Sequence, residues 1–197
     1  PAYEHVVRRD PNHAPAYAQL GKLYMAQGRD DLAVDILERG LVVAAENPAL
    51  WVGLAEAQRG RRDWQGSLAA CQRAVALAPE DAALHNNLGN TYQVLGRPQD
   101  AVAAHQRALV LVPGDAETLL NLGNALLLLE HLDQALDYYQ QALAARADYA
   151  GAWFNLGYVH ELRGEVDQAL AAYARAVELD PGYAAQVAAR RKAIEGD

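Results

Sequence analysis

The sequence is short of the residues that most catalytic and metal sites need. It contains one cysteine, Cys71, one serine, Ser67, and two threonines among 197 residues. A single cysteine excludes an intramolecular disulfide and a multi-cysteine metal site, and so few hydroxyl groups leave little material for nucleophilic catalysis. The six histidines show no spacing typical of metal ligands, and there is no glycine-rich phosphate loop. We therefore expect no catalytic residues, no metal site and no cofactor.

The sequence also lacks excess positive charge and long apolar runs. Its net charge is −8 and its pI is near 5.2, so its long-range field repels phosphate backbones. No apolar run approaches the roughly 18 residues that a membrane-spanning helix needs. We expect neither nucleic-acid binding nor membrane insertion. Arginine outnumbers lysine fifteen to two, a bias typical of GC-rich bacterial genomes; the compartment stays unknown, with the cytoplasm favoured.

What the sequence does contain is a repeat with a period of 34 residues. Its marker is a Leu-Gly or Leu-Ala pair, found at residues 20–21, 54–55, 88–89, 122–123 and 156–157. This register defines five units, at residues 14–47, 48–81, 82–115, 116–149 and 150–183, with 1–13 before them and 184–197 after them. A fixed period of this length indicates stacked supersecondary units. Repeat positions below are counted from the first residue of each unit.

Each unit has the pattern of two helices. Apolar or aromatic residues at positions 4, 7 and 11 surround a small residue at position 8, which is the spacing of an amphipathic helix. A second segment carries aliphatic residues at positions 21 and 28 and ends near a proline in several units, as at Pro79, Pro113 and Pro181. A hairpin of this size buries too little apolar surface to be stable alone, so neighbouring hairpins must stack.

Positions 8, 20 and 27 hold only Gly, Ala or Ser in all five units. Glycine inside a helix costs about 1 kcal/mol relative to alanine, so the glycines at position 8 need a steric reason. Close approach of the partner helix supplies one, because a larger side chain would overpack the crossing. Cys71 occupies position 24, which holds Leu37, His105, Tyr139 and Tyr173 in the other units. We therefore interpret Cys71 as a packing residue and not as a reactive thiol.

This pattern resembles the tetratricopeptide repeat, in which Trp-x2-Leu-Gly-x2-Tyr is followed by Ala, an aromatic residue, Ala and Pro. The resemblance covers all five units. It implies an all-α fold, a right-handed superhelical α-solenoid of stacked antiparallel helix pairs. The second unit departs from the pattern at Ala55, Gln58 and Ser67, and the fifth unit has His160 in place of Tyr.

The two ends fit the same scheme. Residues 1–13 match the second helix of a preceding repeat whose first helix is missing, which would expose Tyr3, Val6 and Val7 and favour self-association. Residues 184–197 keep a helical pattern but place Arg190 at position 7, where the other units have Leu. A polar residue there suits a capping helix, because the last repeat of an array must present a polar outer face.

The candidate binding surface is the side of the first helices that faces away from positions 4, 7, 8 and 11. At about 100° per residue, positions 2, 5, 6, 9, 12 and 13 share that side. The resemblance implies that this stripe lines a concave peptide-binding groove. Its candidate residues are Asn86, Asn87, Asn90, Leu120, Asn121, Asn124, Phe154, Asn155 and Tyr158. Asparagine both donates and accepts hydrogen bonds, so a row of asparagines could hold a peptide backbone.

We interpret the chain as a non-catalytic scaffold that binds a protein or peptide. Position 5 carries no basic residue, which disfavours a clamp for a C-terminal carboxylate. Several alternatives stay open. The asparagines could be inherited family consensus without a ligand, and Leu120, Leu127, Phe154 and Tyr158 could instead contact a neighbouring first helix. The chain could also be the substrate-recruiting region of a larger enzyme resembling the O-GlcNAc transferases, or could form homo-oligomers through its ends.

Overall fold

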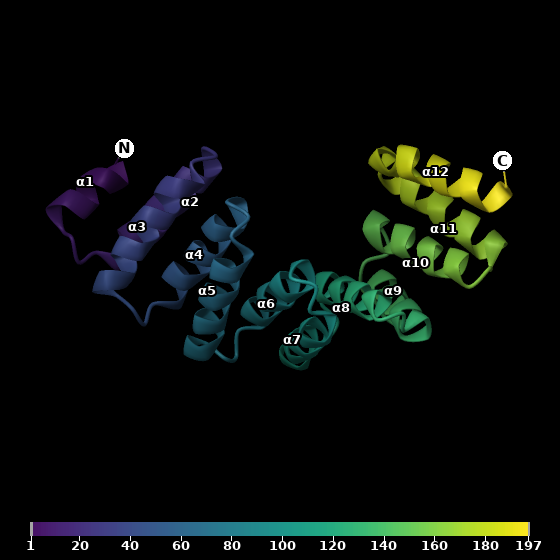
Figure 1. Cartoon of the computed structure of the whole chain (residues 1–197), viewed down its shortest axis with the longest axis horizontal. Coiled ribbons are helices and arrows are strands. Elements are labelled where there is room, and N and C mark those ends of the chain that lie inside the picture. Colours follow the sequence, from purple (N-terminus) through teal and green to yellow (C-terminus); the bar gives the residue numbers. More distant parts are fainter. Residues whose placement is uncertain (1, 197) are drawn as a thin grey trace. The chain divides into compact units, whose positions relative to one another are not determined.

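The computed structural model describes residues 2 to 196, which form helices and no strand (Figure 1). The helices are α1 (Ala2–Arg9), α2 (Ala14–Ala26), α3 (Asp30–Val43), α4 (Pro48–Gly60), α5 (Trp64–Leu77), α6 (Ala82–Val94), α7 (Pro98–Leu111), α8 (Ala116–Leu128), α9 (Leu132–Ala145), α10 (Ala150–Leu162), α11 (Val166–Leu179), the 3-10 turn η1 (Pro181–Tyr183) and α12 (Ala184–Glu195). The predicted all-helical class is confirmed.

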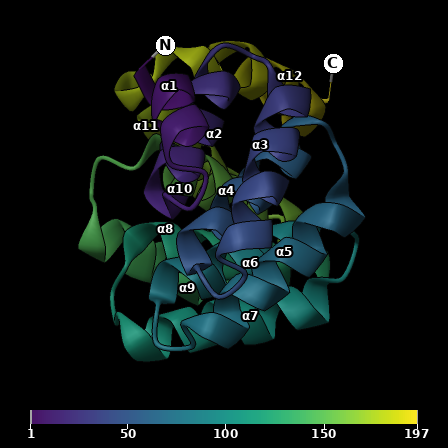
Figure 2. The same ribbon diagram turned by 90° about the vertical axis from the view of Figure 1, so that its left-hand side faces the viewer.

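The chain divides into two compact units, one ending at Arg97 and the other beginning at Pro98. In the N-terminal unit, α2 packs on α3, α4 on α5, and each pair on the next helix along the chain. The short helix α1 lies against α2 (Figure 1 and Figure 2). In the C-terminal unit, α8 pairs with α9 and α10 with α11, with α7 packed on α8 and α12 on α11. Each unit is therefore a stack of adjacent helices.

The helix boundaries follow local signals that recur every 34 residues. First helices begin at residues 14, 48, 82, 116 and 150, and second helices at 30, 64, 98, 132 and 166. Helices α4, α5, α6 and α8 each start at an Asn or Asp cap that accepts a hydrogen bond from the first turn, at Asn47, Asp63, Asp81 and Asp115. At position 15 the backbone takes a φ of 60° to 73°, which suits the three glycines there but not Arg62 and Glu130.

In four of the five units, the side chain at position 4 fixes the loop that leads into the first helix. Four side chains there hydrogen-bond the main-chain carbonyl six residues earlier, at distances of 2.7–3.0 Å: Tyr17, Trp51, His85 and Trp153. A carbonyl oxygen can only accept, so Nε2 of His85 carries the proton in its contact with Pro79. The sequence pattern showed an apolar or aromatic position; it did not show this polar contact.

The small residues at position 8 lie where the partner helix approaches most closely. A Cβ atom added to Gly21 would be 2.7 Å from Cγ of Leu37, and one added to Gly123 would be 2.5 Å from Cε1 of Tyr139. At Gly157 the nearest atom would be Cδ1 of Tyr173 at 2.8 Å. Such distances are shorter than carbon atoms tolerate, so the close-approach interpretation is confirmed. Position 8 is small because position 24 is large.

One expectation about the N-terminal end is wrong. Val7 was predicted to be exposed, yet its side chain is only 4% exposed and belongs to the core. Val6 is half-buried, while Tyr3 is 42% exposed as predicted. The helix α1 turns one apolar side toward α2, and Glu4 accepts a hydrogen bond from the hydroxyl of Tyr24 at 2.9 Å. The apolar surface that could support self-association at this end is therefore smaller than expected.

Candidate functional site

In the C-terminal unit, two of the predicted binding asparagines are bonded to each other. The side-chain nitrogen of Asn155 on α10 donates to Oδ1 of Asn124 on α8 at 2.7 Å. The same oxygen accepts a hydrogen bond from the hydroxyl of Tyr139 at 2.8 Å. Burial raises the pKa of this phenol, which stays protonated and able to donate. Asn124 therefore ties α8, α9 and α10 together.

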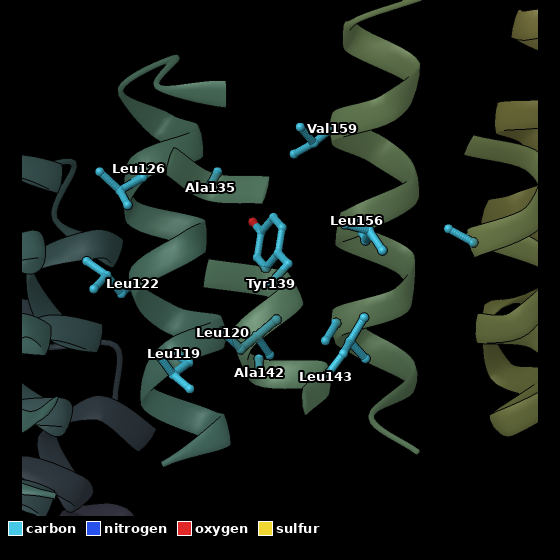
Figure 3. Packing of buried hydrophobic residues seen from close by; sticks show 12 residues of the cluster. Leu119, Leu120, Leu122, Leu126, Ala135, Tyr139, Ala142, Leu143, Leu156 and Val159 are labelled. Carbon is cyan, nitrogen blue, oxygen red and sulfur yellow. The ribbon is translucent and has the colours of Figure 1, made fainter. Parts of the chain in front are cut away.

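Tyr139 fills the space between the two first helices of this unit. Figure 3 shows its side chain between α8 and α10, surrounded by leucines of the buried cluster. It is fully buried, and its ring lies against Gly123. The residue at position 24 thus reaches through the interior to the asparagine stripe, and its length decides whether the stripe is satisfied from within.

Leu120 was predicted to lie on the exposed binding face, and this is wrong. Its side chain is 9% exposed and belongs to the same buried cluster as Leu119 and Leu122 (Figure 3). Leu127, on the same predicted stripe, is only half-buried and packs against this cluster. The cause is the neighbouring first helix, because Leu120 at position 5 points toward α10. The alternative interpretation, contact with a neighbouring helix, holds for Leu120.

Phe154 and Tyr158 are covered by the C-terminal end of the chain. The ring of Phe154 stacks on Tyr183 with centroids 5.1 Å apart, and it lies 5.4 Å from the ring of Tyr173. The guanidinium of Arg190 sits 4.3 Å from the centroid of Tyr158. Both residues are half-buried in this cluster. The predicted exposed aromatic patch is therefore occupied by η1 and α12.

Arg190 also completes a polar contact on α10. Its guanidinium lies 3.3 Å from Glu161, which accepts a hydrogen bond from the hydroxyl of Tyr173 at 2.5 Å. Glu161 is at position 12 of the stripe and Tyr173 is at position 24, so this unit again satisfies the stripe through its own position-24 side chain. In the C-terminal unit, both tyrosines at that position are used in this way.

The N-terminal unit differs at the same positions. Cys71 stands where the C-terminal unit has Tyr139, Glu56 where it has Asn124, and Asn87 where it has Asn155. The thiol of Cys71 lies 3.7 Å from the hydroxyl of Thr91 on α6, and it makes no hydrogen bond to Glu56 or Asn87. Burial raises the pKa of this thiol, which keeps it neutral. The side chain at position 24 in this region therefore gives no hydrogen bond to Glu56 or Asn87.

Three polar side chains in this region have no internal partner. Within residues 2 to 196, Glu56, Arg59 and Asn87 make no side-chain hydrogen bond and no ion pair. Glu56 and Asn87 are half-buried and Arg59 is exposed. Together they surround the mouth of a small cavity between α4, α5 and α6. The predicted site included Asn87 but neither Glu56 nor Arg59.

The other predicted asparagines differ in burial. Asn86 is 9% exposed and so offers little surface, whereas Asn90 and Asn121 are half-buried. Asn86 and Asn121 both interact with other residues of the chain. The predicted stripe is therefore not a uniform row of open amides.

The described part of the chain offers neither a metal-binding cluster nor a membrane span. Residues 2 to 196 contain no group of three His, Cys, Asp or Glu side chains arranged to hold a metal ion. None of their helices combines the length and the apolar character that crossing a membrane requires.

Family models named tetratricopeptide repeat match the sequence at residues 1–57, 80–148 and 120–184. No curated protein matches it. Among solved structures, YrrB, described as a TPR protein with an unusual peptide-binding site, has a TM-score of 0.77 at 19% identity and covers 98% of each chain. MamA has a TM-score of 0.76 at 20% identity, covering 87% of this chain and 93% of its own. A thermophilic TPR protein of Thermus thermophilus, TTC0263, has a TM-score of 0.73 at 26% identity, covering 90% of this chain and 98% of its own.

Proposed function

Because the chain belongs to the tetratricopeptide repeat family, we propose that it is a non-catalytic protein-interaction module that binds an extended peptide segment of a partner. The proposed site is the face of α4 and α6 formed by Glu56, Arg59 and Asn87 in the N-terminal unit. We call these three residues the open rim.

The open rim is the observation that carries this proposal. Its equivalents in the C-terminal unit, such as Asn124 and Asn155, are bonded inside the protein. The rim side chains have no such bonds within the described residues. A half-buried polar group without a protein partner gains from a ligand that supplies one, with each bond worth about 0.5–1.5 kcal/mol net.

The chemistry of the open rim suits a peptide main chain. Each peptide residue offers one N–H donor and one carbonyl acceptor. The carboxylate of Glu56 accepts, the guanidinium of Arg59 donates, and the amide of Asn87 does both. One similar structure, YrrB, is described as having an unusual peptide-binding site. That description supports a peptide as the class of ligand.

The test compares peptide binding by the full chain and two variants. Peptides selected from a random displayed library against the wild-type chain are synthesised and titrated by calorimetry. We expect Glu56→Ala/Arg59→Ala/Asn87→Ala to weaken binding by about tenfold or more, since three hydrogen bonds are removed. The matched control is Arg175→Ala/Glu178→Ala, which removes an exposed ion pair on α11 and should bind normally. Equal binding by all three proteins would refute the proposed site.

A further inference from the structure

The cavity beneath the open rim lies where the C-terminal unit has an aromatic ring. Ala55 and Cys71 line it at positions 8 and 24. In the C-terminal unit those positions hold Gly123 and Tyr139, whose ring fills the space (Figure 3). Cysteine is shorter than tyrosine by the whole ring, and the extra methyl of Ala55 replaces only part of it. The N-terminal unit therefore keeps a hole that the C-terminal unit closes from within.

The cavity is small inside and open to the surface. The centre of a water-sized sphere can move within only about 10 Å³ of it, and its empty space is about 300 Å³ when the open mouth is included. This narrow space suits small aliphatic groups, such as the methyl of alanine or, with part of the group in the mouth, the isopropyl of valine. A phenyl ring is larger than either group and suits this narrow space less well. The shape therefore favours a short side chain entering from the rim.

The inner wall of the cavity is apolar or already satisfied. Ala74 and Leu84 supply aliphatic surface. The hydroxyl of Ser67 donates to the carbonyl oxygen of Ala55 at 3.0 Å, so its proton is already used. The thiol of Cys71 is neutral and 6% exposed. A wall of this kind favours an aliphatic group over a polar or charged one, because a polar group would lose its water contacts without full replacement.

We propose that this cavity receives a small aliphatic side chain, alanine or valine, of the extended peptide that the open rim holds. The inference rests on the proposed function and adds the side chain that the site selects. The rim binds the main chain on either side of that residue, and the cavity distinguishes its side chain by size. Each methyl group buried there strengthens binding about fourfold, so a valine peptide should bind at least about tenfold more tightly than a glycine peptide.

The test fills the cavity with the residues of the C-terminal unit. Ala55→Gly/Cys71→Tyr copies the Gly123 and Tyr139 pair and removes the hole while leaving the open rim in place. The probe is the tightest library-selected peptide, resynthesised with Gly, Ala, Val, Leu or Phe at the position that selection restricts most. We expect the wild-type chain to prefer Val or Ala, and the filled variant to bind the Val and Gly peptides within about twofold of each other. Circular dichroism establishes that the variant folds.

A second measurement uses the unchanged protein. Cys71 is the only thiol in the chain, so its rate of reaction with a small methylthiolating reagent reports directly on the cavity. Saturating Val peptide should slow this reaction several-fold, and saturating Gly peptide should slow it much less. Equal rates with and without the Val peptide would show that the bound side chain lies elsewhere.

The outcomes separate the two proposals. If peptides bind through the open rim but wild-type and filled chains discriminate equally, or if Phe is preferred, the cavity proposal is overturned and the rim proposal stands. If peptides bind but do not depend on the rim, both are overturned. A library that yields no binding peptide also overturns both.

Discussion

The region α4–α5–α6 and the region α8–α9–α10 are built from the same repeat positions. They differ in whether the polar side chains of the stripe are hydrogen-bonded inside the protein. In the second region Tyr139 crosses the interior, bonds Asn124, and Asn124 bonds Asn155. In the first, Cys71 stops short, and Glu56 and Asn87 have no partner within the described residues. In these two regions, the side chain at position 24 decides whether the polar stripe is bonded from inside the protein.

We expect the largest loss of stability from a substitution in the region α8–α9–α10. Tyr139→Cys removes a fully buried ring and its hydrogen bond to Asn124, and a change of this size in a core costs about 3–5 kcal/mol. Chemical denaturation of the chain should report this loss. Cys71→Ala removes only the sulfur and should cost about 1 kcal/mol. Similar losses for the two variants would contradict the difference between the regions.

The next largest effect concerns His105, whose imidazole is buried on α7 at position 24 of the third unit. Burial lowers the pKa of His105 to about 4, from 6.5 when exposed. Between pH 6.5 and 4 the unfolded chain binds a proton that the folded chain does not, so stability falls as the pH is lowered through this window. The loss approaches about 3 kcal/mol near pH 4.

Unfolding curves at pH 7 and pH 4.5 measure this dependence. The control is His105→Tyr, which places at this position the residue that α9 and α11 carry and which does not titrate in this range. The wild type should lose more stability than the variant on acidification. An equal loss would mean that His105 is not the group responsible.

Overpacking the crossing at position 8 is expected to cost about 2 kcal/mol. A Cβ atom on Gly123 would already lie 2.5 Å from Tyr139, so Gly123→Leu must push the ring aside. Ala55→Val at the same position faces Cys71 and should cost less, because the cavity absorbs part of the added volume. Thermal melting of both variants tests this order. An unchanged melting temperature for Gly123→Leu would contradict the close-approach argument.

The smallest effect concerns the turns, in which the two regions do not differ. Arg62 in the N-terminal unit and Glu130 in the C-terminal unit both have a φ of 60°, where other repeats use glycine. Arg62→Gly and Glu130→Gly should each stabilise the chain by about 1 kcal/mol, since a side chain in this conformation is strained. Equal gains in stability would show that the two regions differ in their interiors and not in their turns. A loss of stability in either variant would contradict the prediction that the side chain is strained there.

The repeat, the helix pairs and the small residues at position 8 could be predicted because they depend on local periodicity and on one steric rule. The asparagine stripe could not be resolved in the same way. The side-chain amide of Asn155 can donate a hydrogen bond either to Asn124 or to a bound peptide. In the structure it donates to Asn124, whose side-chain oxygen also accepts from Tyr139 at position 24. Periodicity alone places both residues on one face and says nothing of that reach.

Two changes in the sequence of the second unit indicate that the region α4–α5–α6 differs from the others. Ala55 replaces glycine at position 8 in the same unit in which Cys71 replaces a larger residue at position 24. Taken together, these changes indicate a shorter interior side chain and a gap above it. The covering of Phe154 by Tyr183 was harder to foresee, because it requires the exact path of η1 after α11.

The most direct measurement is a titration of the ¹⁵N-labelled full chain with the selected Val peptide, followed by NMR. We expect amide shifts to change at α4, at α6 and around Cys71, while the resonances of Asn124, Tyr139 and Asn155 stay where they are. Shifts concentrated at α8 and α10, with α4 and α6 unchanged, would contradict the proposal that the peptide binds at the open rim.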